Sequence, residues 1–184
     1  ILNNRWRWSW RLGSMPFLLS GSFLMTTPPL ANVLPIYVAS RASIEARPQM
    51  WRSLRDQGWQ ISSTWIDKLG EDTSDNPDAL TELWACIESE IAQSAGVLLY
   101  GEPEDFPLRG ALMECGFALG MGKHVAIVAP VVEIDENMRP LGSWVRHPRV
   151  RMFSDLESAR DWLLDPQPAL DASPGSTAPR PGGR

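Results

Sequence analysis

The sequence predicts an α/β fold: a flavodoxin-like or Rossmann-like three-layer sandwich around a five-stranded parallel sheet in the order 2-1-3-4-5. Expected strands alternate with expected helices over residues 34–165, which indicates βαβ units with helices on both faces of the sheet. The chain is 43% hydrophobic and 21% charged, which is usual for a protein with a globular core. Right-handed crossovers then leave few possible strand orders.

Five short runs rich in apolar residues are expected as the strands, and the last of them is the weakest. They are residues 34–40, 59–65, 95–100, 123–129 and 149–153. The expected helices are residues 48–57, a segment that begins at 76–77, residues 109–121 and residues 156–164. Pro48 suits the first turn of the first helix, and Gly58 suits its end. The second helix has one apolar face, formed by Leu80, Leu83, Trp84, Ile87 and Ile91.

The two ends of the chain differ from this domain. Residues 1–33 are expected to be a poorly ordered extension, in which arginines alternate with tryptophans before an apolar run. The pattern is similar to a signal peptide, and the run is too short for a transmembrane helix. The favoured interpretation is an upstream segment with Met25 as an internal start, and a third is an arm that docks on a partner or a membrane surface. Residues 166–184, rich in Pro, Gly, Ala and Ser, are expected to be disordered.

The formal net charge of −5 provides no basic footprint for nucleic acid. We therefore expect neither a nucleic-acid nor a membrane partner, and favour a small-molecule site or a protein partner. Cys86 and Cys115 form no CxxC pattern, and His124 and His147 lack ligand spacing. These residues imply no disulfide framework, metal site or cofactor, and the expected compartment is the reducing cytoplasm.

Parallel sheets of this kind bind ligands beyond the carboxyl ends of the strands, near the point where the strand order reverses. The loops expected around the pocket follow Ser40, Trp65, Tyr100 and Ala129. The first loop offers Ser40, Arg41 and Ser43, whose hydroxyls and guanidinium can hold a phosphate or a carboxylate. The alternative interpretation is a capped, solvated loop.

Glu114 is the residue on which the functional prediction depends. It lies about one turn inside the helix expected over 109–121, whose N-terminus favours anions and whose Gly110 lets a ligand approach the backbone. Its neighbours are apolar or lack a side chain: Met113, Cys115, Gly116 and Phe117. A solvated helix face rarely has this composition, so we expect a positioned and partly desolvated carboxylate.

Glu88 is the expected second carboxylate. It lies one turn after Trp84, late on the preceding helix, and the short connection to the next strand allows it to approach the same strand ends. Two carboxylates in unlike environments are the usual equipment for cleaving a glycosidic bond. The alternative interpretation is a charge on the helix surface, since Glu90 is nearby.

Several segments resemble the nucleoside 2-deoxyribosyltransferase family, which includes 2′-deoxynucleoside 5′-monophosphate N-glycosidases. They are the strand Ile36-Tyr-Val-Ala-Ser40, the helix that ends at Gly58, the strand over 95–100 and, above all, residues 110–123. The resemblance covers roughly residues 34–160. Its most specific part is Glu-x-Gly-x-Ala-x-x-x-Gly-Lys, which begins at Glu114.

The resemblance implies that Glu114 is a nucleophile that forms a covalent deoxyribosyl-enzyme, with Tyr37 close to it. Glu88 falls where the family usually has an aspartate, eight residues before Gly96. The residues matched to substrate binding are Ser40, Arg41 and Ser43 for the sugar 5′ end or its phosphate, and Asp105 as a looser match to a base-contacting acid. Arg109 and Gly110 are expected to bind substrate because they lie at the helix start. The arginines favour a monophosphate over a bare nucleoside.

The resemblance also implies a homodimer or a higher homo-oligomer, acting on a small nucleoside or nucleotide. Trp144, close to His147, either faces a neighbouring subunit or packs on its own core. Two departures from the family pattern are Glu in place of Asp at position 88 and Gly96 in place of an acidic residue. They leave three hypotheses open: an enzyme of N-glycosidic bonds, a nucleotide-binding or sensing domain without full turnover, and an interaction protein that uses its Trp/Arg-rich extension.

Overall fold

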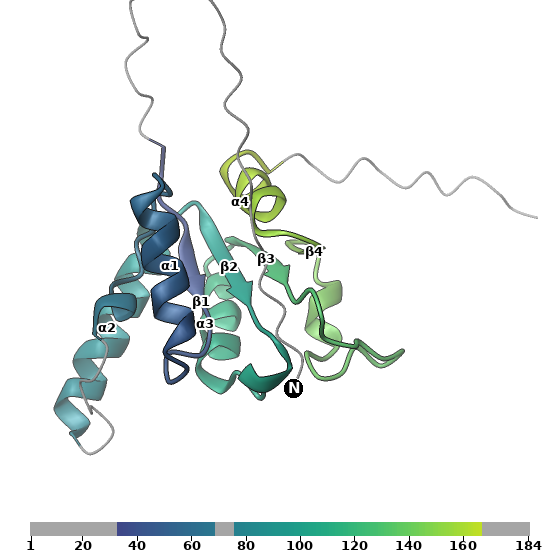
Figure 1. Ribbon diagram of the computed structural model, residues 1–184, viewed down its shortest axis with the longest axis horizontal. Coiled ribbons are helices and arrows are strands. Elements are labelled where there is room, and N and C mark those ends of the chain that lie inside the picture. The colour runs from purple at the N-terminus through teal and green to yellow at the C-terminus, as the bar shows by residue number, and fades with distance from the viewer. Residues whose placement is uncertain (1–32, 69–75, 167–184) are drawn as a thin grey trace, which may run out of the picture. The chain divides into compact units, whose positions relative to one another are not determined.

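The computed structural model describes residues 33–68 and 76–166 (Figure 1). The predictions for the N-terminal extension and the Pro/Gly-rich tail fall outside these residues. Within the described part of the chain, the α/β prediction is confirmed, with a parallel sheet of four strands and four α-helices. None of the helices described is long and apolar enough to cross a membrane.

The four strands pair in parallel in the order β1-β2-β3-β4. Their bounds are β1 (Tyr37–Ala39), β2 (Gly96–Tyr100), β3 (His124–Val128) and β4 (Val150–Phe153). Val38 pairs with Leu98, and Leu98 pairs with Ala126. Strands β1, β2 and β3 are almost fully buried, as expected when helices cover both faces of a parallel sheet.

The predicted second strand is reduced to one parallel bridge between Ile36 and Ile61, so the five-strand order is not confirmed. Beyond this bridge, side chains replace the backbone ladder along β1. The Ser63 hydroxyl accepts a hydrogen bond from Val38 N at 2.7 Å and donates one to Val38 O at 3.1 Å. The Trp65 indole donates to the same carbonyl oxygen at 2.9 Å. Because the edge of β1 is already bonded, the chain can leave it early.

The helices follow their predicted positions closely. Their bounds are α1 (Ala46–Asp56), α2 (Pro77–Gln93), α3 (Arg109–Gly120) and α4 (Leu156–Leu164), with short 3₁₀ helices η1 (Thr64–Asp67), η2 (Pro103–Asp105) and η3 (Ser143–Arg146). The Asn76 side chain caps α2 by accepting hydrogen bonds from the backbone N–H groups of Asp78 and Ala79. Pro77 follows at the first helical position, where a missing N–H has no cost.

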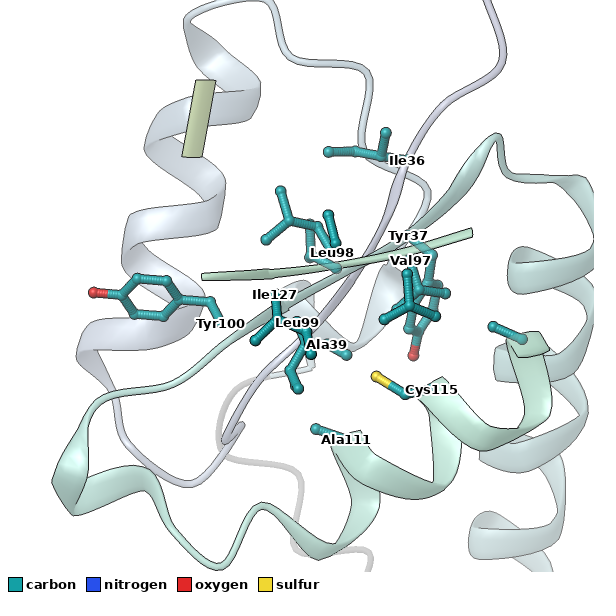
Figure 2. Close-up of a cluster of buried hydrophobic side chains, with 14 of the residues drawn as sticks. Ile36, Tyr37, Ala39, Val97, Leu98, Leu99, Tyr100, Ala111, Cys115 and Ile127 are labelled. Atoms are coloured by element: carbon teal, nitrogen blue, oxygen red, sulfur yellow. The ribbon is translucent and has the colours of Figure 1, made fainter. Parts of the chain in front are cut away.

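Alternate side chains of the strands point to opposite helix layers. Tyr37 points toward α3, whereas Tyr100 points away from it, toward α1 (Figure 2). There the Trp51 ring meets the Tyr100 ring edge-on, with centroids 6.0 Å apart. Gly96 shares the face of Tyr100 and lies against Leu163 of α4. The layers are therefore α2 and α3 on one face of the sheet and α1 and α4 on the other (Figure 1).

The packing at Gly96 explains why this position holds no acidic residue. A Cβ atom placed there would lie 2.7 Å from Leu163 Cδ2 and 2.8 Å from the carbonyl oxygen of His124. The second of these atoms belongs to the paired strand and cannot move freely. The departure from the family pattern at this position is therefore a packing requirement of β2 and α4.

We expect Gly96→Ala to lower the free energy of unfolding by about 1–3 kcal/mol, because the new methyl group overlaps with neighbouring atoms. Gly116→Ala is the matched control: it lies in α3 with nothing within 4 Å of an added Cβ. This control should be neutral or stabilising by about 0.5–1 kcal/mol. Urea unfolding followed by tryptophan fluorescence measures both, and equal midpoints for the two variants would contradict the packing argument.

Candidate active site

A cavity of about 490 Å³ opens at the carboxyl ends of β1 and β2. It is lined by Ser40, Arg41, Ala42, Asp105, Pro107, Leu108, Arg109, Gly110, Ala111 and Glu114. Its size falls within the usual range for small-molecule sites. Of the four loops predicted around the pocket, those after Ser40 and Tyr100 provide lining residues. No described residue of the loops after Trp65 and Ala129 does so.

Helix α3 brings its first turn and Glu114 to this cavity. Leu108 precedes the helix in the left-handed backbone conformation, with φ of 52°, and no side chain caps the helix start. Gly110 has nothing within 4 Å of an added Cβ, so the backbone here is open to the cavity. Arg109 also lines the cavity and makes no hydrogen bond or ion pair with any described residue. An exposed helix start with a nearby guanidinium is suited to an anion.

Glu114 is only 9% exposed, and burial raises the pKa of its carboxyl group from 4.5 to about 7. The Tyr37 hydroxyl lowers this pKa, and the negative charge of Glu90 raises it. Burial, together with the charge of Glu114, also raises the pKa of Tyr37. Glu114 Oε2 and the Tyr37 hydroxyl are buried without a hydrogen-bond partner among the described residues. The pair therefore keeps hydrogen-bonding capacity for a ligand.

The surroundings of Glu114 differ in part from the prediction. Cys115 is fully buried, but Met113 is 66% exposed and Gly116 is also exposed, so neither shields the carboxylate. The burial of Glu114 comes instead from the packing of α3 on the sheet: Ala111 and Cys115 lie on the buried side of α3, and Tyr37 of β1 points toward it (Figure 2). The carboxylate was correctly predicted to be desolvated, and tertiary packing supplies the reason.

Glu88 does not reach the cavity: it is exposed and is not among the lining residues. Successive residues of an α-helix point about 100° apart, so Glu88 and Glu90 project from opposite flanks of the side of α2 that Ile87 and Ile91 bury. The carboxylate that acts on Glu114 belongs to Glu90, which is half-buried and accepts a hydrogen bond from Thr64 N at 3.2 Å. Glu90 lies three residues after Ile87 and Glu88 lies three residues before Ile91, so helix spacing alone does not separate the two.

The residues predicted to bind the sugar 5′ end separate into two groups. Ser40 lines the cavity, and its hydroxyl accepts a hydrogen bond from the Trp51 indole at 2.9 Å. Arg41 also lines it, but its Nη1 donates to the carbonyl oxygens of residues 104–106 at 3.1–3.3 Å. Ser43 is exposed outside the cavity and accepts from Arg41 Nε at 3.1 Å. Arg41 therefore joins the two loops that form the cavity.

Asp105 is fully buried and is held by Arg47, a residue that the sequence interpretation missed. Arg47 Nε donates to both carboxylate oxygens, at 3.0 and 2.8 Å, and Glu102 N donates to Oδ2 at 2.8 Å. Arg47 also forms ion pairs with Glu102 at 3.3 Å and Glu104 at 3.0 Å. The Asp105 carboxylate, held in this way, supports the loop, and Asp105 also lines the cavity.

Other candidate groups lie outside the site. No cluster of His, Cys, Asp or Glu that could hold a metal ion occurs among the residues described. Cys86 is exposed, and Cys115 is buried. Trp144 is half-buried, and its indole donates to Leu141 O at 2.8 Å, so this ring packs on its own domain.

Fold and site together define an α/β domain with a cavity of small-molecule size at the strand ends and the buried acid Glu114 in its wall. No protein-family model and no curated protein matches the sequence. Among solved structures, the 2-deoxyribosyltransferase from Bacillus psychrosaccharolyticus matches with a TM-score of 0.51 and 18% identity, over 69% of this chain and 90% of that one. A CMP N-glycosidase from Clostridium botulinum matches with a TM-score of 0.40 and 15% identity, over 70% of this chain and 96% of that one.

At 18% identity, the match to the 2-deoxyribosyltransferase shows a shared fold. The resemblance predicted from the sequence is therefore confirmed at the level of the fold. The 2-deoxyribosyltransferase is an enzyme by its name.

The raised pKa of Glu114 predicts how stability depends on pH. The folded state favours the neutral carboxyl group, so this contribution is complete below pH 4.5 and is lost as pH rises through about 7. Glu114→Gln stays neutral, so it should match wild type near pH 4 and exceed it by about 3 kcal/mol at pH 8. Urea unfolding across this pH range measures the difference. A difference that does not vary with pH would show that Glu114 titrates normally.

Proposed function

We propose that this protein cleaves or transfers at the N-glycosidic bond of a (deoxy)nucleoside or its 5′-monophosphate, through a covalent glycosyl intermediate on Glu114. The observation that carries the proposal is a buried carboxylate with an unused oxygen, next to the Tyr37 hydroxyl, on the wall of a nucleoside-sized cavity. The fold shared with a 2-deoxyribosyltransferase supports the same class of reaction.

In the proposed first step, ionised Glu114 attacks the anomeric carbon and forms a carbon–oxygen bond to the sugar. The bond between the sugar and the base breaks, and its electron pair leaves with the base nitrogen, which takes up a proton from solvent or a nearby acid. In the second step, water or a second base attacks the same carbon and releases Glu114. Water gives hydrolysis, and a second base gives transfer.

Tyr37 is proposed to hold the nucleophile. Its hydroxyl lies close enough to lower the pKa of Glu114 and can donate to the carboxylate before attack. Its own pKa is raised well beyond neutrality, so it keeps its proton throughout. A protonated phenol beside a buried carboxylate supports the ionised form without itself reacting.

The 5′ end of the sugar is proposed to lie at the start of α3. Arg109 is the lining guanidinium without a partner among the described residues, and the uncapped first turn of the helix adds N–H donors. Ser40 lies on the cavity wall from the opposite loop. A phosphate can accept hydrogen bonds from all three groups, so we favour the monophosphate as substrate.

A second candidate is a nucleotide-binding domain of the same fold that does not turn its ligand over. It is favoured by the shortage of a free proton donor: the acids that line the cavity are Asp105 and Glu114, and Asp105 is held by Arg47. This candidate predicts that a nucleotide raises the melting temperature without release of free base. Base release from any member of the same panel rejects it.

Glu114→Gln should lower base release by at least about 10³-fold, because an amide cannot act as the nucleophile. For the wild type, kcat/KM should rise as pH passes through about 7 and then level off, since Glu114 must be ionised. Chromatography of free base from a nucleoside and nucleotide panel measures both. Glu88→Gln, exposed on α2, is the control and should retain wild-type rates. Undiminished base release by Glu114→Gln would refute the proposal.

Arg109→Ala should raise KM for a deoxynucleoside 5′-monophosphate by about tenfold, the loss expected for one charge-assisted contact. Its KM for the corresponding deoxynucleoside should change little, because that substrate has no phosphate to contact. Steady-state kinetics on the two substrates tests this. An equal change for both would place the phosphate elsewhere.

A further inference from the structure

Two arginines from the first β–α unit, Arg41 and Arg47, hold the loop of residues 102–107. Arg41 donates to the carbonyl oxygens of three successive residues of this loop. Arg47, which is only 6% exposed, binds the carboxylates of the same loop. Because both backbone and side chains are held, the loop has little freedom to move relative to β1 and α1.

The Arg47 cluster is connected to the other wall of the cavity by a chain of contacts. The Arg47 guanidinium lies over the Tyr100 ring, 5.4 Å from its centroid, and the Tyr100 hydroxyl donates a hydrogen bond to Glu102. The Trp51 ring packs edge-on against Tyr100 and its indole donates to Ser40. The loop after β1, which contains Ser40, and the loop after β2 are thus both in contact with the same group of aromatic and charged side chains.

The same loop determines where α3 begins. Leu108 N donates to Asp105 O at 3.4 Å, and Leu112 N donates to Leu108 O at 2.9 Å in the first turn of the helix. Arg109 follows Leu108 directly, so the position of its backbone depends on Asp105. Since Arg47 holds the Asp105 carboxylate, a shift of Arg47 is transmitted to the first turn of α3 through these bonds.

We infer that Arg47 is a positioning residue, which places the first turn of α3 for contact with the 5′-phosphate of the substrate. The inference rests on the proposed function for the identity of the ligand. Arg47 does not line the cavity and does not touch the substrate; it acts through Asp105 and the loop. Its effect is confined to the phosphate end, because Glu114 lies one turn further along α3 and is positioned by the sheet.

The shape of the guanidinium is essential to this role. Arg47 uses Nε for Asp105 and Nη2 for Glu102 and Glu104, so one planar group holds three carboxylates at once. A lysine ammonium keeps the positive charge that the buried Asp105 requires. It has a single nitrogen, however, so it cannot hold all three carboxylates as the planar guanidinium does. Arg47→Lys should therefore fold and leave the loop less well placed.

The test is isothermal titration calorimetry of the full chain with 2-deoxyribose 5-phosphate and with 2-deoxyribose. Arg47→Lys should weaken binding of the phosphorylated sugar by about tenfold, a loss typical of a slightly misplaced contact, and change binding of the free sugar less than about twofold. The matched control is Arg55→Lys, which lies on α1 like Arg47 and alters an ion pair with Asp67 of η1, outside the cavity. It should bind both sugars as wild type does.

A second variant, Arg47→Met combined with Asp105→Asn, removes both charges and so leaves no buried charge unpaired. It should show the same selective loss. In kinetics, Arg47→Lys should raise KM for the monophosphate and leave kcat and its pH midpoint unchanged.

Unchanged binding of the phosphorylated sugar by both variants would overturn the inference. An equal loss for both sugars, or a fall in kcat alone, would overturn it as well. If wild type binds the two sugars equally, no phosphate contact exists for Arg47 to position and the inference is wrong. The proposed function is judged separately, by release of base from nucleosides.

Discussion

Burial of the Glu114 carboxylate beside the Tyr37 hydroxyl is the constraint on which the site depends. An ionised carboxylate in this position is destabilised by loss of water, which raises its pKa to about 7. The sheet and α3 must be stable enough to hold it there. Burial of a carboxylate at a cost in stability is common at catalytic sites. A well-solvated glutamate would be a weaker and less directed nucleophile.

The two acids that line the cavity, Asp105 and Glu114, are both buried but differ in how many hydrogen-bond partners their carboxylates have. Asp105 is completely buried and fully compensated, by the Arg47 fork and one backbone N–H group. Glu114 is nearly as buried and has an oxygen without a partner among the described residues. The first arrangement gives a rigid loop. The second arrangement leaves the Glu114 carboxylate able to react with a ligand. The number of partners therefore distinguishes Asp105, a structural acid, from Glu114, a candidate catalytic acid.

Much of the fold could be predicted because its signals are local. Asn76 and Pro77 mark the start of α2 through backbone and capping preferences, and the strands are continuous apolar runs. The strand expected over 59–65 failed because Ser63 and Trp65 bond to β1 through their side chains, which residue alternation does not reveal. The burial of Glu114 was predicted from its apolar, glycine-rich sequence context, but Met113 and Gly116 are exposed and packing on the sheet buries the carboxylate.

The rest of the site depends on contacts between distant parts of the chain. Arg47 lies 58 residues from Asp105, and no local pattern links the two. Glu88 and Glu90 differ only in the side of α2 from which they project, and that difference appears once α2 is placed against β1 and α3. For the same reason the family resemblance, read by position, assigned the second carboxylate to the exposed residue.

The most direct measurement is intact-protein and peptide mass spectrometry after rapid acid quench of the protein with a deoxynucleoside 5′-monophosphate. The account predicts a deoxyribosyl 5-phosphate adduct on the peptide that contains Glu114, formed together with the first equivalent of free base and absent from Glu114→Gln. Steady base release with no adduct on that peptide, undiminished in Glu114→Gln, would contradict it.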